Sequence, residues 1–344
     1  MKKVSIQILK LILSGCISLA LLSLFCYFYN YTGRHVINED GSTDYKWEAN
    51  QYFSNMKEGF TWFRFDADGF NNPSDAAFTG EPVDILLLGS SHMEAVQIPK
   101  DQNTAVLLGT YFPEKHVYNL GVSSHTIFSC VQNLPAAVEK YKPTSYVILE
   151  TDSIAFDVDA MRNSAGGVYP EVETVQSGTL YEVQKRIPAV KSLYKAYVDW
   201  RNVSAWHGSQ IQFEGPAEPF IIPEEAWVEY EEVLRDFLGK AKAVMPASCQ
   251  LLIFYHPGTL LDEAGEYHAP DTGRAGKLFV QVCKELDIIF VDLSEDFEKL
   301  YVRENILAHG FINGGVGIGH LNARGHQVIA EVLYKTILER EETR

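Results

Sequence analysis

Five short runs of mostly apolar residues constrain the fold of this chain more strongly than any other feature. They lie at residues 85–88, 116–120, 145–150, 250–255 and 288–291. Runs that stay apolar without alternating with polar residues are typical of strands buried on both faces of a sheet. Helical patterns lie between them. The sequence therefore predicts an α/β fold with a doubly wound, largely parallel five-stranded sheet.

Three amphipathic helices are the clearest of those helical patterns. Residues 224–244, 274–286 and 323–339 each place their apolar residues on one face, and the third is followed by a charged tail. In an open α/β sheet, ligands bind outside the carboxyl ends of the strands. Polar residues that directly follow the apolar runs are therefore the first candidates for a functional site.

The N-terminus has the composition of a membrane anchor. Lys2, Lys3 and Lys10 precede residues 11–33, which contain no charged residue, and about 20 apolar residues suffice to cross a bilayer as a helix. The lysines predict a single-pass protein of the cell membrane with a cytoplasmic N-terminus and an extracytoplasmic body. A cleaved signal peptide is the main alternative, but no small-x-small cleavage site follows. Lipidation at Cys16, in a lipobox-like LSGC, is a weaker alternative.

Charge and cysteine content exclude several classes of protein. The net charge of −16 argues against a nucleic-acid partner, because such proteins need a basic face. Cys130, Cys249 and Cys283 are too few for a disulfide scaffold; three buried thiols are favoured over one bridge and a spare thiol. Without CxxC pairs or closely spaced His and Cys, we expect no metal site and no cofactor.

The chain divides into three predicted parts. Residues 1–33 form the cytoplasmic N-terminus and anchor, residues 34–82 an extracytoplasmic linker or N-terminal segment without sustained periodicity, and residues 83–344 the main domain. Within that domain, residues 153–223 mix glycine, serine, proline and aromatic residues. Long irregular segments are unusual unless they form a lid or a binding surface, so this segment is interpreted as an insertion over the sheet.

Four motifs follow one another at the positions where a ligand site is expected. Gly89-Ser90-Ser91-His92 follows the first apolar run, YNLGVSS with Gly121 the second and LETDS with Asp152 the third, and GHLNARGH with His320 precedes the last helix. This order resembles the SGNH/GDSL hydrolase superfamily, specifically its membrane-anchored bacterial branch that acts on cell-envelope polymers. The resemblance spans about residues 83–338 and implies a flavodoxin-like SGNH hydrolase fold.

The resemblance also implies catalytic roles. Ser91 matches the nucleophile and His320 the base, which a serine hydroxyl needs because it is otherwise weakly nucleophilic. The backbone N–H groups of Ser91 and Gly121 would form an oxyanion hole. Without a Cβ, Gly121 would let its backbone approach a ligand closely.

Two departures from the family pattern leave roles open. Asp152 stands where the family usually has an oxyanion-stabilising Asn; a protonated Asp152, or Thr151, could donate instead. Gly317 occupies the position of the family's triad Asp, three residues before the histidine. Either a Ser–His dyad oriented by a backbone carbonyl, or Asp292 at the end of the fifth run, would then complete the site.

Each of these residues also has a structural interpretation. A serine after a strand is usually a helix N-cap, and an isolated loop histidine usually has no catalytic role. Asn322 and His326 are expected to hold the loop against the last helix. His92 and Glu94 are expected to line the pocket or face solvent, and His256, after the fourth run, could contact substrate.

The predicted function is that of an extracytoplasmic serine esterase or O-acyltransferase acting on acylated cell-envelope polysaccharide, such as capsule, peptidoglycan or teichoic-acid decorations. A transferase would need a multi-pass membrane protein to export the acyl group. A catalytically degenerate protein that binds envelope polymer or scaffolds an assembly is the alternative. A third possibility is lipid or thioester hydrolysis, whereas a groove lined by Trp200 and Trp206 would favour glycan.

Overall fold

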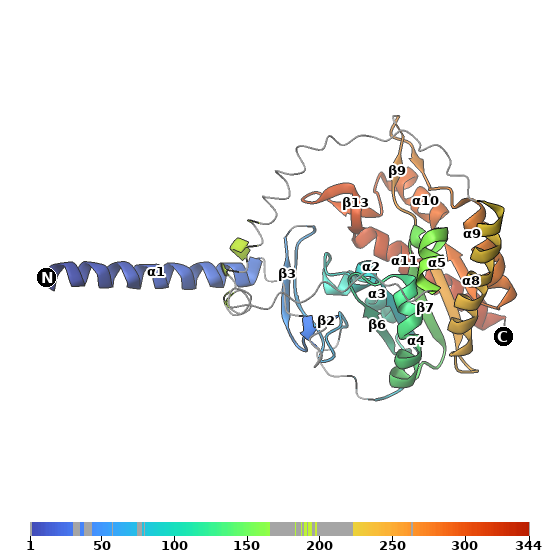
Figure 1. Ribbon diagram of the computed structural model, residues 1–344, viewed down its shortest axis with the longest axis horizontal. Helices are drawn as coiled ribbons and strands as arrows, with labels where there is room; N and C mark the ends of the chain where they lie inside the picture. The colour runs from blue at the N-terminus through green and yellow to red at the C-terminus, as the bar shows by residue number, and fades with distance from the viewer. Residues whose placement is uncertain are drawn as a thin grey trace.

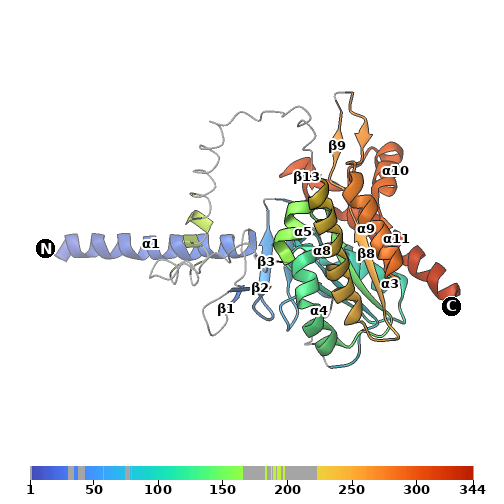
Figure 2. The same cartoon turned by 45° about the vertical axis from the view of Figure 1, so that its right-hand side comes forward.

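The computed structural model describes residues 2–29, 35–37, 43–56, 58–73, 78, 80–165, 223–262 and 264–343, and a few residues between 183 and 197. Helix α1 (Lys2–Tyr29) projects as a separate rod from an α/β body (Figures 1 and 2). Within it, Val4–Tyr27 has a mean hydropathy of 2.2 and is long enough to cross a membrane, a test that a signal sequence also passes.

The body is built on one five-stranded parallel sheet. Its strands are β5 (Ile85–Gly89), β6 (Val117–Gly121), β7 (Tyr146–Thr151), β8 (Gln250–Tyr255) and β11 (Ile289–Asp292), in the spatial order β11-β8-β7-β5-β6. Numbered along the chain, this order is the 2-1-3-4-5 of flavodoxin-like folds. The five apolar runs are thus the five strands, and the predicted fold class is confirmed.

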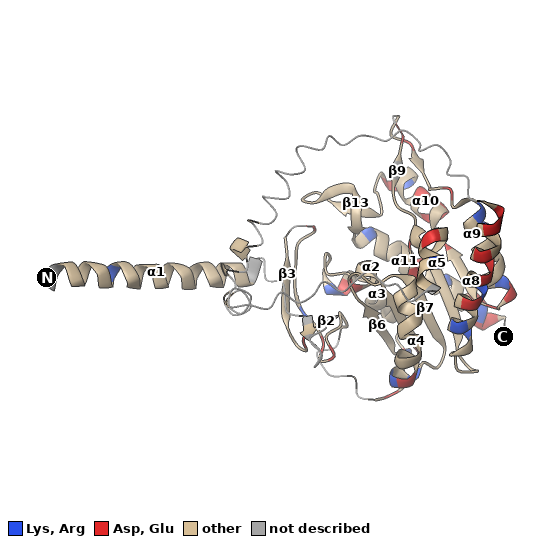
Figure 3. Cartoon of the chain, in the orientation of Figure 1, with Lys and Arg blue, Asp and Glu red and all other residues tan. Residues whose placement is uncertain are grey.

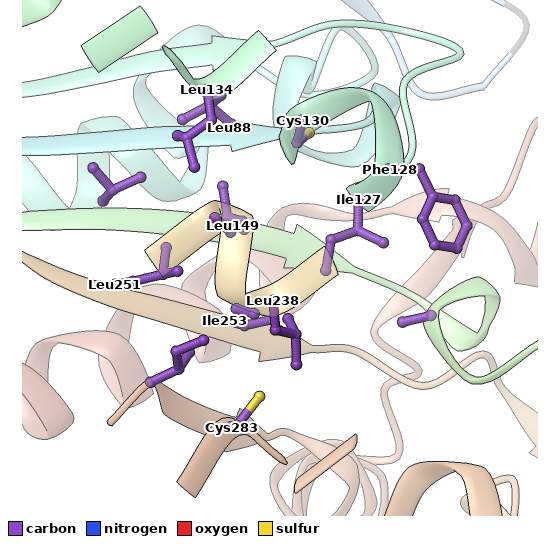
Figure 4. Close-up of a cluster of buried hydrophobic side chains, with 14 of the residues drawn as sticks. Leu88, Ile127, Phe128, Cys130, Leu134, Leu149, Leu238, Leu251, Ile253 and Cys283 are labelled. Atoms are coloured by element: carbon purple, nitrogen blue, oxygen red, sulfur yellow. The ribbon is translucent and has the colours of Figure 1, made fainter. Parts of the chain in front are cut away.

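Helices cover both faces of the sheet because its residues point alternately to the two sides. Leu86 and Leu88 pack with α4 (Ile127–Tyr141), α8 (Glu224–Ala243) and α9 (Gly273–Glu285), as Figure 4 shows in part. Ile85 and Leu87 pack on the other side with α3 (Thr104–Tyr111), α10 (Ser294–Glu304) and α11 (Ala323–Glu342). The three predicted helices correspond to α8, α9 and α11. Many of the charged residues of α8 and α9 lie on the outside of the body (Figure 3).

The N-terminal segment is folded and is more than a linker. It forms two antiparallel hairpins, β1 (His35–Ile37) with β2 (Thr43–Trp47) and β3 (Tyr52–Asn55) with β4 (Thr61–Arg64). Their aromatic residues form a small core of their own with one residue of the main domain: Trp47, Phe53, Phe63, Phe65 and Val96. Asn72 also pairs with the backbone of Asn119, which fixes the segment against the edge strand β6.

Short elements complete the described structure. A second pair of hairpins is formed by β9 (Leu260–Leu261) with β10 (Tyr267–His268) and by β12 (His309–Phe311) with β13 (Gly315–Leu321). The remaining pieces are α2 (Ser91–Glu94), η1 (Lys100–Gln102), η2 (Ser153–Phe156) and α5 (Val158–Ala165). Most of the proposed insertion, including Trp200 and Trp206, lies outside the described residues.

The cysteines behave as the sequence predicted. All five are free thiols, and Cys130, Cys249 and Cys283 are buried. Cys130 and Cys283 pack in the core between the sheet and its helices (Figure 4), where burial raises the pKa of both thiols. They are therefore small apolar core residues and not bridge partners.

Candidate active site

The turn from β5 into α2 presents Ser91. Gly89 ends the strand, and a Cβ there would lie 2.7 Å from Glu150 Oε2. Ser90 is the N-cap of α2: its Oγ accepts the His92 N–H at 3.1 Å, while its own N–H donates to Glu150 Oε2 at 2.6 Å. With Ser90 used as the cap, Ser91 becomes the first helical residue and its hydroxyl is left for another partner.

That partner is His320, on β13. The Ser91 hydroxyl lies 2.9 Å from His320 Nε2, and the opposite ring nitrogen, Nδ1, lies 2.6 Å from Glu58 Oε2. Glu58 Oε1 also accepts the backbone N–H of His320 at 2.5 Å. The three side chains thus form a continuous hydrogen-bonded Ser–His–Glu chain, the arrangement by which serine hydrolases activate a hydroxyl.

Glu58 lies in the loop between β3 and β4, so the acidic member of this chain comes from the N-terminal segment. Partial burial tends to raise the pKa of this carboxyl, but the hydrogen bonds from His320 outweigh it and lower the pKa below its usual value. Gly319 makes room for this contact, because a Cβ at Gly319 would overlap Glu58 Oε1. Glu58 is therefore ionised at neutral pH and doubly held by its histidine.

The two completions predicted from the sequence are replaced by Glu58. Asp292 is exposed and accepts the Ser294 N–H at 2.9 Å, which makes it a cap at the start of α10. A dyad oriented by a backbone carbonyl is also wrong, because a carboxylate occupies His320 Nδ1. Gly317, at the position of the family's Asp, has a φ of +82° in β13 and supports the hairpin instead.

The predicted oxyanion hole is only partly available. Ser91 is the first residue of α2, and among the described residues no group accepts its backbone N–H. The Gly121 N–H donates to Asn119 Oδ1 at 2.8 Å, so it is already engaged. The missing Cβ of Gly121 serves packing, because it would overlap the backbone N of Glu94.

Asp152 and Thr151 do not supply the missing donor. Asp152 Oδ1 accepts the Ile154 N–H at 2.8 Å and caps η2. The Thr151 hydroxyl donates to the carbonyl of Asp152 at 3.1 Å. Neither side chain is therefore placed as an oxyanion donor.

Glu94, at the end of α2, is a buried carboxyl beside the site rather than a solvent-facing one. Its Oε1 accepts the Trp47 indole N–H at 2.6 Å, and its Oε2 pairs with the Ser123 hydroxyl. Burial raises the pKa of Glu94 to about 7, against the opposing effect of these hydrogen bonds. This one carboxyl joins the N-terminal segment, α2 and the loop after β6.

A group of histidines, His92, His256 and His309, lies beside His320. The ring of His92 lies 5.3 Å from that of His320 and 4.6 Å from that of His256, measured between centroids. Burial, and then neighbouring histidines, lower the pKa of His92 well below its usual value and that of His309 to about 3. These rings are therefore neutral at physiological pH.

His256 is part of the interior and does not border an open cleft as expected. It is 1% exposed, and its Nε2 lies 2.7 Å from Glu150 Oε1. Asn322 has the structural role predicted for it, whereas His326 connects α11 to α3 and does not hold the loop. Asn322 caps α11 through two backbone N–H groups and donates to the Leu307 carbonyl, and His326 Nδ1 lies 2.8 Å from the Thr104 hydroxyl.

An apolar groove runs along the hairpin that carries His320. It has a volume of about 890 Å³ and is bordered by Gly59, next to Glu58, and by His309. Its other walls are mostly apolar, among them Phe60, Leu307 and Val316. Gly59 thus brings the edge of this apolar groove next to Glu58, while Ser91 and His320 are not among the residues that line it.

No protein-family model matches the chain, and no curated protein does. Among solved structures, LAE5, an alpha/beta hydrolase enzyme from the metagenome of Lake Arreo, Spain, is 17% identical over 74% of this chain and 94% of its own, with a TM-score of 0.40. The acetyl xylan esterase AlAXEase is 13% identical over 74% and 99%, again with 0.40. A GDSL-like lipase from Parabacteroides merdae is 14% identical over 75% and 97%, also with 0.40. At these scores the likeness carries no inference about this chain's reaction.

Proposed function

We propose that this chain is a serine esterase or O-acyltransferase of the SGNH type. The observation that carries the proposal is the hydrogen-bonded chain of Ser91, His320 and Glu58, with distances of 2.9 and 2.6 Å. Its support in the sequence is the order of the Ser91, Gly121 and His320 motifs, which resembles that superfamily. Each residue then has one chemical task.

In acylation, Ser91 Oγ attacks the ester carbonyl carbon while His320 Nε2 takes the hydroxyl proton. Glu58 holds Nδ1–H and stabilises the imidazolium that forms. The Ser91 N–H, free of other acceptors among the described residues, stabilises the developing oxyanion. When the C–O bond of the ester breaks, His320 returns the proton to the leaving alcohol, and the acyl group remains on Ser91.

In deacylation, His320 takes a proton from the second nucleophile as that nucleophile attacks the acyl-enzyme. Water gives a free acid and makes the protein an esterase, whereas a sugar hydroxyl gives a new ester and makes it a transferase. Either path regenerates Ser91. Comparing the products formed from an acetylated glycan with and without an acceptor sugar distinguishes the two, because only a transferase moves acetyl to the acceptor.

The proposed substrate is an acylated cell-envelope polysaccharide. This follows from the resemblance and from α1, which we interpret as an uncleaved anchor with a cytoplasmic N-terminus that holds the site outside the membrane. An acyltransferase would take its acyl group from a multi-pass membrane partner. The apolar groove beside Gly59 and His309 favours lipid or thioester hydrolysis as a second candidate. Acetyl esters hydrolysed better than octanoyl esters would exclude that candidate.

The first experiment tests the nucleophile. The full chain in detergent is treated with a fluorophosphonate probe and assayed with p-nitrophenyl acetate, beside Ser91→Ala, His320→Ala and Ser90→Ala. Ser90 is the matched control, because it is the adjacent serine and its hydroxyl serves as a cap. We expect labelling and hydrolysis to be lost in the first two variants and kept in the third, which should lose only about 1 kcal/mol of stability.

Labelling that is independent of Ser91 would overturn the proposal. So would a wild-type protein that neither reacts with the probe nor cleaves the ester. In either case the non-catalytic alternative, a protein that binds envelope polymer or scaffolds an assembly, takes its place. The Glu58 contact weakens that alternative, because Glu58 supplies an acid to His320 where the family position, Gly317, has none.

A further inference from the structure

We propose that His92, His256 and His309 bind one divalent transition-metal ion of the zinc class beside the catalytic triad. One ring nitrogen of each lies within 4.8 Å of the others. The three residues come from α2, from the position after β8 and from β12. Because they are far apart in the sequence, no spacing motif announces them.

Two of the rings carry unused nitrogens. Within the described part of the chain, Nδ1 of His256 and Nδ1 of His309 are buried and have no hydrogen-bond partner. The two residues are 1% and 5% exposed. A buried polar atom without a partner is costly, and imidazole nitrogens are common zinc ligands.

His256 has the environment of a metal-binding histidine, because a carboxylate already contacts one of its two ring nitrogens. Its Nε2 faces the buried Glu150 carboxylate at 2.7 Å, which leaves Nδ1 directed elsewhere. A carboxylate that holds the far nitrogen of a histidine fixes the ring and its tautomer for metal binding. Glu150 also accepts the Ser90 N–H, so the same carboxylate links this ring to the turn that presents Ser91.

His92 supplies the third nitrogen. Its Nδ1 accepts the Leu321 N–H at 3.2 Å, a long bond that fixes the ring between α2 and β13. Tetrahedral zinc, with bonds of about 2.0–2.1 Å, would draw the three nitrogens to about 3.3 Å from one another. A bound ion would therefore cross-link α2, the end of β8 and β12, which surround Ser91 and His320.

The test is a titration of the full chain, purified in detergent without a histidine tag, with Co²⁺ and then Zn²⁺. We expect visible absorption typical of tetrahedral Co²⁺ at one ion per chain, and its loss when Zn²⁺ displaces the Co²⁺. His309→Ala should abolish the signal. Glu150→Gln keeps all three rings and should weaken binding by about 10- to 100-fold, which keeps the test valid if His309→Ala does not fold.

A matched control is offered by the exposed cluster of Asp262, Glu266 and His268, whose groups are also close enough to hold an ion. His268→Ala should leave the titration unchanged. Absence of Co²⁺ binding, or binding that His268→Ala abolishes and His309→Ala does not, would overturn the proposal. Ser91→Ala should still bind the ion, so failure of the proposed esterase function and failure of the metal site remain distinguishable.

Discussion

At the scale of single residues, the site depends on how one carboxylate is held. Glu58 contacts both the ring and the backbone of His320, at 2.6 and 2.5 Å. Two bonds to one residue fix the carboxylate in position as well as in charge, and the ring of His320 is thereby kept with Nε2 toward Ser91. Orientation of this kind is what the acid of a serine triad contributes.

Replacing Glu58 by Gln should lower kcat for p-nitrophenyl acetate by about 10²- to 10⁴-fold, because an amide cannot stabilise the imidazolium and favours the wrong tautomer. Asp292→Asn is the matched control, since Asp292 is the carboxylate that the sequence offered as one of two completions of the site, and Asn can still accept the Ser294 N–H. We expect that control to retain its activity. Steady-state kinetics on both variants would contradict the assignment if Asp292→Asn were the slower.

Glu94 makes the stability of the protein depend on pH. Its pKa is raised from an ordinary 4.5 to about 7 in the folded protein, so the folded state binds this proton more tightly than the unfolded state does. The resulting stability is fully present below about pH 4.5 and is lost as the pH rises to about 7. The loss is about 3 kcal/mol at 1.36 kcal/mol for each pKa unit.

Glu94→Gln should remove that dependence, because the amide resembles the protonated acid and can still bond Trp47 and Ser123. We expect the variant and the wild type to have similar melting temperatures at pH 5 and the variant to melt higher at pH 8. The measurement is thermal unfolding across this range. Parallel melting curves for the two proteins at every pH would show that Glu94 does not carry the effect.

Among the elements, the β12–β13 hairpin sets the geometry of His320, the proposed base. Gly317 and Gly319 both have φ above +80° in β13, a conformation that glycine adopts without strain. They differ in their surroundings, because a Cβ at Gly319 would overlap Glu58 Oε1, while one at Gly317 would lie 2.8 Å from the flexible end of Leu307. The pair therefore separates backbone strain from displacement of the acid.

Gly319→Ala should reduce kcat nearly as far as Glu58→Gln does, because the added methyl displaces the carboxylate. Gly317→Ala shares the backbone strain and should lose stability, with a much smaller effect on kcat. Kinetics and thermal unfolding of both variants check this. Equal losses of kcat would mean that strain in the hairpin, and not the position of Glu58, limits the reaction.

For the whole molecule, the sheet was predictable and the N-terminal hairpins were not. The three inner strands β5, β7 and β8 are almost completely buried on both faces, so each appears in the sequence as a continuous apolar run. The hairpins β1–β2 and β3–β4 bury only scattered aromatic residues, such as Trp47 and Phe53, and leave others such as Trp62 exposed. A segment of that kind has no clear period, which is why the sequence does not distinguish a linker from a folded N-terminal segment.

The site, too, contains residues that the sequence predicts and one that it does not. Ser91 and His320 stand in local motifs beside a strand end and a helix start, and the structure brings them together. Glu58 lies in the loop between two short strands, and its contact with His320 exists only through tertiary packing. No local pattern in the sequence could have identified it.

The expected orientation in a membrane rests on Lys2, Lys3 and Lys10, which lie in the first part of α1, and it is directly testable. Alkaline phosphatase joined after residue 343 should be active in a bacterial host, because the body is expected outside the cytoplasm. Membrane fractions washed at high pH should retain the chain if α1 is an uncleaved anchor. An inactive fusion would indicate the opposite topology, with the body in the cytoplasm. A shortened product that is soluble would establish that α1 is cleaved.

Glu58 and Ser91 lie in the first third of the sequence and His320 lies near its end, so the three residues are synthesised at different times. Glu58 leaves the ribosome early, Ser91 soon after it, and His320 only near the end. Segments made first generally fold first. The N-terminal hairpins that carry Glu58 can therefore form before His320 has been synthesised. On the proposed mechanism, a nascent chain is therefore inert toward esters until His320 has been translated, and a product truncated before β13 keeps Ser91 but lacks the base that activates it.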